Sequence, residues 1–187
     1  PTKVIVVAKA HPRVLILGFS EAGMLLNRSQ SDVAAAIAIQ GFREPAIDVS
    51  RIARRLMLRF DDVDVVDRSD PLAIARMQLR QRFAGGSDEI LQPPTPQDAQ
   101  AIIEFAQSLG ELNGTLLCQC HGGISRSSAA ALLCLATWTP PGNEAYCVEY
   151  VRSARSGAAP HPDVVAFGDE LLGRKGRLNE ALQEASM

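Results

Sequence analysis

The sequence predicts a single α/β domain, spanning residues 1–187, in which a central, mostly parallel sheet is flanked by helices. Short apolar runs typical of buried strands recur along the chain, separated by stretches with helical periodicity. One of these runs, Thr115–Gln119, leads through a glycine-containing loop into an apolar helix at Ser127–Trp138. A buried strand followed at once by a loop and a helix is the repeating unit of parallel sheets. With 187 residues, of which 47% are hydrophobic, the chain is long enough to bury a substantial core.

The chain before this unit contains the other predicted strands. They are Val4–Ala8, Val14–Phe19, Ala34–Ile39 and Arg55–Phe60, and Phe19–Arg28 has a helical pattern. Residues 64–94 are harder to assign: Pro71–Phe83 has a helix-forming composition, and glycine and proline turns follow it. We interpret residues 64–94 as either an insertion with a solvated basic face or a lid whose arginines attract a phosphorylated substrate.

Helices are predicted on both sides of the strand–loop–helix unit. Thr95-Pro96 opens a helix that Gly110 ends, and this helix leads into the strand at Thr115. After Trp138, Asn143 is predicted to cap one helix and Asp163 to cap another at Val164–Leu172. The turn at Gly173–Arg177 and the polar last helix are predicted to be solvated.

Composition excludes several classes of partner. The formal net charge of −2 argues against nucleic acid as a partner. No apolar run approaches the length that spans a membrane, and the N-terminal apolar runs are too short and too interrupted by charge for a signal peptide. The four cysteines include no C-x-x-C pair. We therefore expect reduced cysteines, a cytoplasmic location and no membrane partner.

The loop from Cys120 to Arg126 has the composition of an anion site. A strand, a tight loop and a helix start in succession direct backbone N–H groups and the positive end of a helix dipole at one point. Gly122 and Gly123 allow the backbone to turn sharply and to touch a ligand. The amides of residues 121–126, the helix start and the Arg126 guanidinium would stabilise a Cys120 thiolate and bind the oxygens of a phosphoryl group.

The segment Cys120-His-Gly-Gly-Ile-Ser-Arg126-Ser127 resembles the Cys-x5-Arg-Ser/Thr loop of the cysteine-dependent protein tyrosine phosphatases. It is most similar to the small bacterial members that are like the dual-specificity phosphatases. The resemblance implies a dual-specificity-phosphatase-like fold and assigns Cys120 as the nucleophile. It places the substrate phosphate on His121, Gly122, Gly123, Ile124, Ser125 and Arg126, with the Ser127 hydroxyl near the sulfur that departs in the second step.

The same resemblance reverses the interpretation of Asp61-Asp62. By themselves, two aspartates after a strand are typical of a solvated turn. In the resembling family the general acid lies on a loop after a strand, often before Ile or Val, which favours Asp62, with Asp61 in reserve. The family usually has a histidine before the nucleophile, whereas this chain has Gln119 there. His161 stands near a position where the family often has an asparagine, and is either a functional residue or an ordinary loop histidine.

The implied reaction is hydrolysis of a phosphate monoester through a phosphocysteine, with no metal or cofactor. The expected substrate is a phosphorylated protein or a small phosphoester, and phosphate, sulfate or vanadate should bind in the loop. The absence of lysine from the loop argues against phosphoinositides. A zinc site is not expected at Cys118, Cys120 and His121, because their spacing is not that of zinc ligands.

Three alternative functions use the same loop. An arsenate reductase or a rhodanese-like sulfurtransferase would not need the aspartate upstream. A non-catalytic phosphate-binding module would not need nucleophile, arginine and hydroxyl together. An RNA 5′-phosphatase would be expected to carry a basic surface bearing aromatic side chains.

Overall fold

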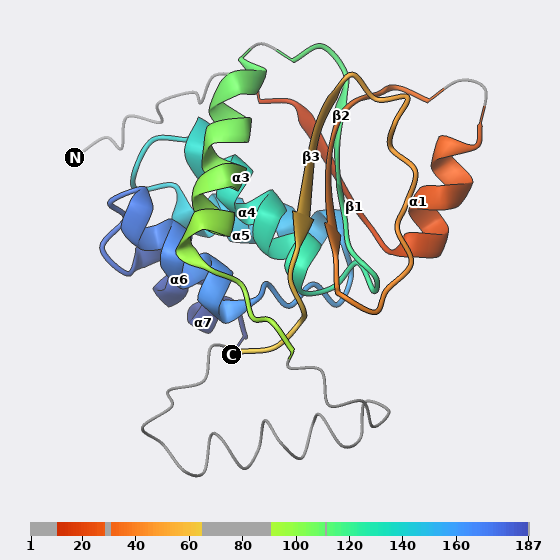
Figure 1. Cartoon of the computed structure of the whole chain (residues 1–187). Helices are drawn as coiled ribbons and strands as arrows, with labels where there is room; N and C mark the ends of the chain where they lie inside the picture. Colours follow the sequence, from red (N-terminus) through yellow and green to blue (C-terminus); the bar gives the residue numbers. More distant parts are fainter. Residues whose placement is uncertain (1–10, 29–30, 65–90, 111, 187) are drawn as a thin grey trace.

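Four parallel strands form the sheet at the centre of the computed structural model, which describes residues 11–28, 31–64, 91–110 and 112–186 (Figure 1). The strands are β1 (Arg13–Leu17), β2 (Val33–Gln40), β3 (Arg54–Arg59) and β4 (Thr115–Gln119). Their order across the sheet is β1-β4-β2-β3, and all three pairings are parallel. The predicted α/β class with a parallel sheet is therefore confirmed. Strand β4 lies between two neighbours, so the loop that follows it emerges from the interior of the sheet.

Helices cover both faces of the sheet. They are α1 (Phe19–Leu26), α3 (Pro96–Leu109), α4 (Arg126–Trp138), α5 (Glu144–Ala154), α6 (Pro162–Leu171) and α7 (Arg177–Ser186). Figure 1 shows α1 alone on one side of the strands and the other labelled helices on the opposite side. The larger layer has α4 at its centre, where every residue from Arg126 to Ala136 is buried. This burial explains why α4 is apolar on nearly all sides.

Alternation along β4 divides the core into two clusters. Leu116, Cys118 and, just beyond the strand, Cys120 pack into the larger cluster under α3 to α7. Leu117 points the other way and packs with Ala22 of α1 in the smaller cluster. Successive side chains of a strand point to opposite faces. The parity of β4 thus places the sulfur of Cys120 on the side of the sheet where α4 begins.

Most elements predicted from the sequence occur close to their predicted bounds. Thr95 caps α3 as predicted: its hydroxyl oxygen accepts a hydrogen bond from Asp98 N at 3.3 Å, and the Asp98 carboxylate accepts from Thr95 N at 2.8 Å. The predicted strand Val4–Ala8 and the predicted helix Pro71–Phe83 lie outside the described residues, as do residues 65–90 of the expected insertion or lid.

Of the two caps predicted near the C-terminus, the one at Asp163 is wrong and the one at Asn143 holds for its position only. Helix α6 begins two residues earlier than expected, with Pro162 as its first residue and His161 rather than Asp163 as the residue before it. Proline suits the first helical position because its missing N–H would have no partner there. Asn143 does precede α5 as predicted, but its side chain makes no capping bond to the helix.

The turn at Gly173–Arg177 is also less solvated than predicted. Arg174 is 4% exposed, and its guanidinium donates hydrogen bonds to the carbonyls of Ala136 and Thr139 and to Glu144. Leu178, in the first turn of the polar helix α7, is fully buried. This turn lies between α6 and α7, and Arg174 reaches from it to carbonyls at the C-terminal end of α4 that have no helical donor.

Candidate active site

The loop between β4 and α4 lies at the carboxyl edge of the parallel sheet, where ligands of open α/β folds bind. Its first residue is braced by the strand end. Gln119 is 4% exposed, and its side-chain amide donates a hydrogen bond to the carbonyl of Cys120 at 2.7 Å. Gln119 thus holds the start of the loop at the position where the resembling family usually has histidine.

The sulfur of Cys120 receives contacts from two groups of the loop and helix. Its Sγ lies 3.1 Å from the Ser127 hydroxyl oxygen, and the backbone N–H of Gly123 donates to it at 3.3 Å. Cys120 is only 1% exposed, so this sulfur is held in one position by the surrounding loop. An amide and a hydroxyl directed at sulfur are the groups that stabilise negative charge on it.

The two glycines of the loop do different jobs. Gly123 has φ +69°, and a Cβ placed on it would lie 2.4 Å from the backbone nitrogen of Gly18, at the end of β1. Only glycine fits this close approach of two backbones. Gly122 does not have a positive φ, and a Cβ there would meet nothing closer than a side-chain carbon of Ile124 at 3.8 Å. The expectation that both glycines permit an unusual backbone therefore holds for Gly123 alone.

The rest of the loop is held from behind. Ile124 and Ser125 use their carbonyls to accept hydrogen bonds from the backbone N–H groups of Ala159 and His161, at 3.0 and 3.3 Å. The hydroxyl of Ser128, which the sequence analysis did not single out, donates to the same two carbonyls. His121 is exposed, and its carbonyl accepts from Phe19 N at 2.9 Å. Because these carbonyls bind groups outside the loop, the loop amides can point toward the Cys120 sulfur, as that of Gly123 does.

Arg126 is held by a residue that the sequence analysis missed. Its side chain is 2% exposed, and Glu44 grips both terminal nitrogens, with Nη1–Oε2 at 2.9 Å and Nη2–Oε1 at 2.5 Å. Nη1 also donates to the carbonyl of Phe60 at 3.1 Å. Burial tends to lower the pKa of the guanidinium, but the Glu44 carboxylate outweighs it and the pKa of Arg126 is raised.

Part of the Arg126 guanidinium remains available to bind a ligand. A guanidinium has five N–H donors, and three of them are engaged by Glu44 and Phe60. The two left over are Nε–H, which is buried without a hydrogen-bond partner, and one N–H of Nη2. Nε and Nη2 form one edge of the planar fork, which suits two oxygens of a phosphoryl group. Arg126 can therefore make the predicted two-oxygen clamp only through this edge.

Glu44 is itself fixed by the turn that follows β2. The N–H of Gly41 donates to Oε2 at 2.7 Å, and a Cβ on Gly41 would lie 2.9 Å from the Glu44 carboxyl carbon. Burial would raise the pKa of Glu44, but the hydrogen bonds from Arg126 and Gly41 lower it below its ordinary value. The only signal in the sequence was an acidic residue three positions after a glycine at the end of a buried strand. That pattern is too common to indicate a site.

Asp61 and Asp62 occupy different environments. Asp61 is 8% exposed, and its two oxygens accept hydrogen bonds from the backbone N–H groups of Phe42 and Gln92 at 3.0 and 2.9 Å. Asp62 faces the loop: its Oδ1 accepts from the Ser125 hydroxyl at 2.6 Å, and its Oδ2 lies 3.9 Å from Arg126 Nε. Both oxygens of Asp61 are occupied by backbone, whereas the side chain of Asp62 is 43% exposed. The structure brings Asp62, not Asp61, to the loop.

His161 lies against the same segment. It is 2% exposed, and its Nε2 is 3.1 Å from the carbonyl oxygen of Val63 and 3.8 Å from Oδ1 of Asp62. From the sequence, His161 is either a functional residue or an ordinary loop histidine. It is a buried histidine in contact with the segment that carries Asp62.

Comparison with solved structures identifies the fold. Tk-PTP, solved in its active form, matches with a TM-score of 0.55 and 16% identity, covering 91% of this chain and 99% of that one. Human DUSP28 matches with a TM-score of 0.52 and 16% identity over 91% and 99%. PTPMT1 in complex with PI(5)P matches with a TM-score of 0.50 and 14% identity over 89% and 97%.

The chain has the fold of the cysteine-dependent tyrosine and dual-specificity phosphatases. The agreement covers nearly the whole of each solved chain. No protein-family model matches the sequence, and no curated protein is significantly similar to it. Of the helices in the described part of the chain, none has the length and apolar character needed to cross a membrane.

Proposed function

We propose that this protein is a cysteine-dependent protein tyrosine or dual-specificity phosphatase that works through a phosphocysteine intermediate. The observation that carries the proposal is the arrangement around Cys120. Its sulfur contacts the Ser127 hydroxyl and the backbone N–H of Gly123. The Nε–Nη2 edge of Arg126, at the end of the same loop, is available to a ligand. The Asp62 carboxylate accepts a hydrogen bond from the Ser125 hydroxyl. A nucleophile, an oxyanion clamp and an acid together are the parts that phosphoryl transfer to sulfur requires.

In the first step the Cys120 thiolate attacks phosphorus, so that an S–P bond forms as the bond to the leaving oxygen breaks. Asp62 gives its proton to that oxygen, because alkyl and tyrosyl oxygens leave poorly as anions. The loop amides and the Nε–Nη2 edge of Arg126 bind the three equatorial oxygens throughout. None of these steps uses a metal or a cofactor.

In the second step water replaces the sulfur. The water oxygen attacks phosphorus and the S–P bond breaks, while the ionised Asp62 takes a proton from the water. The departing sulfur takes up negative charge, and the Ser127 hydroxyl at 3.1 Å is placed to donate a hydrogen bond to it. Inorganic phosphate then leaves the loop.

The position of Asp62 favours a phosphatase over the alternative users of such a loop. A sulfurtransferase or an arsenate reductase has no need of an acid that a loop hydroxyl holds over the site. A passive phosphate-binding module would have no need of a hydroxyl at the sulfur. One structural neighbour was solved with PI(5)P, but the loop here contains no lysine. We therefore propose a phosphorylated protein or a small phosphoester, rather than a phosphoinositide, as the substrate.

The test uses pure protein, a phosphotyrosine peptide, a phosphoserine peptide and PI(5)P, with release of inorganic phosphate as the readout. The wild type should hydrolyse the phosphotyrosine peptide, and rapid acid quenching should trap phosphate on Cys120. Cys120→Ser should lose turnover but still bind vanadate, because the amides and Arg126 remain. Turnover by Cys120→Ser within tenfold of wild type would remove Cys120 as the nucleophile. Release of sulfite from thiosulfate, or reduction of arsenate to arsenite, without phosphate release would favour the alternative functions.

A further inference from the structure

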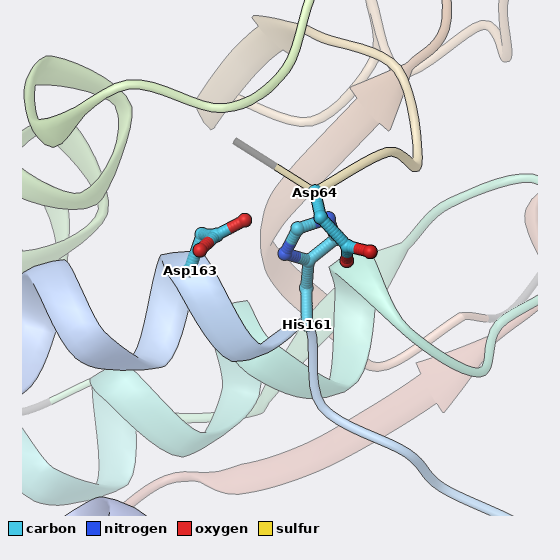
Figure 2. A group of neighbouring side chains, drawn as sticks. All are labelled: Asp64, His161 and Asp163. Carbon is cyan, nitrogen blue, oxygen red and sulfur yellow. The ribbon is translucent and has the colours of Figure 1, made fainter. Parts of the chain in front are cut away.

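Three potential metal ligands lie beside the segment that carries Asp62. Asp64 comes from the chain just after β3, and His161 and Asp163 come from the start of α6. One ligand atom from each lies within 4.8 Å of the other two. Figure 2 shows His161 rising from the start of α6 next to Asp163, with Asp64 reaching toward it from the segment after β3. None of the three belongs to the loop that holds Cys120.

The imidazole of His161 is arranged as that of a metal ligand. Its Nε2 lies 3.1 Å from the carbonyl oxygen of Val63. A carbonyl oxygen can only accept, so Nε2 must carry the proton and Nδ1 of the neutral ring is left with a free lone pair. Histidines that bind metals through one nitrogen usually donate the other N–H to a carbonyl or carboxylate in this way.

The remaining nitrogen has no protein partner. Nδ1 of His161 is buried and makes no hydrogen bond within the described residues, on a side chain that is 2% exposed. Figure 2 shows this nitrogen, the one nearer the backbone, on the side of Asp163. A buried polar atom without a partner costs free energy, so its retention calls for an explanation. A metal ion bound with the two neighbouring carboxylates would supply one.

We propose that Asp64, His161 and Asp163 bind a divalent metal ion of the Zn²⁺ class. One imidazole nitrogen and two carboxylate oxygens suit zinc, which is four-coordinate with such ligands at about 2.0–2.2 Å. Ligand atoms around a tetrahedral ion at that distance are about 3.4 Å apart. The three ligand atoms lie within 4.8 Å of one another, so they would have to move closer together to bind the ion. Water would fill the fourth position.

The ion would act on the shape of the site and not on the chemistry. Asp64 follows Asp62 by two residues, and His161 donates its backbone N–H to the carbonyl of Ser125 in the loop. A metal bound between them would tie the segment of Asp62 to the start of α6 and, through it, to the back of the loop. Asp62 would then be held nearer to one position over Cys120.

The test measures zinc binding in a background that lacks the competing thiolate. Full-length Cys120→Ser, stripped with a chelator, is titrated with zinc chloride by calorimetry and with cobalt by absorption spectroscopy. It should bind one equivalent, and the cobalt spectrum should show tetrahedral nitrogen–oxygen ligation without a thiolate charge-transfer band. Asp64→Asn and Asp163→Asn in this background should each weaken binding at least tenfold, and the double variant should bind no zinc at this site.

Glu170→Gln is the matched control, because it removes one negative charge from an exposed position of the same helix α6. It should bind zinc as the parent does. Equal affinity in the parent and both aspartate variants would overturn the proposal, as would absence of binding in the parent. A thiolate band in the cobalt spectrum would place the ion on a cysteine and overturn it as well. None of these outcomes depends on phosphatase activity.

Discussion

The two sides of the candidate active site are built in different ways. The side that carries the nucleophile is a continuous stretch of eight residues from Cys120 to Ser127 between β4 and α4. The opposite side is assembled from three separate segments, which contribute Glu44, Asp62 and His161. The continuous side sets out the reacting groups in a local pattern, whereas the assembled side decides how those groups are oriented. Substitutions on the two sides should therefore impair catalysis in different, measurable ways.

The largest effect is expected for Arg126→Lys, on the continuous side. An ammonium cannot offer the planar Nε–Nη2 edge to two oxygens while also meeting Glu44. Loss of two hydrogen bonds to the transition state, each worth about 10²–10³ in rate, should lower kcat by about 10⁴-fold or more. Steady-state kinetics on a phosphotyrosine peptide would measure this, with thermal unfolding to check that the variant folds.

Arg155→Lys is the matched control for that variant. Arg155 also contacts the loop, but from outside, through the carbonyl of Gly122 at 3.2 Å and a pair with Glu21. Arg155 binds only the outer side of the loop, and lysine can keep the partly exposed pair with Glu21, so this replacement should change kcat by much less. Equal losses in the two variants would mean that Arg126 acts by holding the loop and not by binding the substrate.

Asp62→Asn tests the assembled side. Loss of the general acid should reduce kcat by about 10²–10⁴-fold on phosphotyrosine and by less on an activated aryl phosphate, whose oxygen leaves unaided. The fall in activity at high pH should also disappear, since it reports the need for a protonated acid. Both are measured from pH–rate profiles on the two substrates.

Asp61→Asn separates the neighbouring carboxylates. Asp61 accepts two backbone hydrogen bonds, so its replacement should lower the melting temperature and leave the leaving-group dependence unchanged. If Asp61→Asn is instead the variant that depends on the leaving group, the assignment of the acid is off by one residue.

Glu44→Gln should lower kcat by less. Glu44 belongs to the assembled side but contacts Arg126 on the continuous side. A neutral amide cannot grip both terminal nitrogens of Arg126 as acceptors, so the free edge of the guanidinium would be less well aligned. Misplacement of a binding group by about 1 Å costs up to about 10²-fold, and we expect a loss of that order or below in kcat. Glu104→Gln, an exposed glutamate on α3, is the control and should behave as wild type.

The pH dependence of stability supplies a second measurement for Glu44. Because its folded-state pKa is lowered, its contribution is present above the ordinary carboxyl value of 4.5 and is lost as pH falls through the lower folded value. Wild type should therefore lose more stability than Glu44→Gln between about pH 5 and pH 3. If the unfolding free energies of the two proteins changed equally with pH across this range, the ion pair would be contradicted.

The smallest effect is expected for Gln119→His. Gln119 braces Cys120 through its carbonyl, a bond that histidine can also donate, so the loop should keep its shape. Histidine adds a titratable group beside the nucleophile and should shift the acidic limb of the pH–rate profile. Superimposable profiles would show that residue 119 serves only as a brace.

The sequence by itself was enough for the features that depend on neighbours along the chain. The strand, loop and helix around Cys120 were predicted because apolar periodicity and glycine placement act over a few residues. Neighbouring side chains at a strand end tend to point to opposite sides, and the observed partners of Asp61 and Asp62 differ accordingly. The choice of Asp62 as the acid nevertheless came from the family resemblance, since the pair by itself is typical of a turn.

Tertiary structure alone decided which distant residues complete the site. Glu44 is 82 positions from Arg126 along the chain, and no local rule joins them. His161 was noted, but its burial and its contact with Val63 depend on how α6 packs against α3 and α4. The same reason explains Arg174, which was predicted in a solvated turn and is buried on the carbonyls of Ala136 and Thr139. The partners of a buried charge come from other elements, so they become apparent only when those elements are packed together.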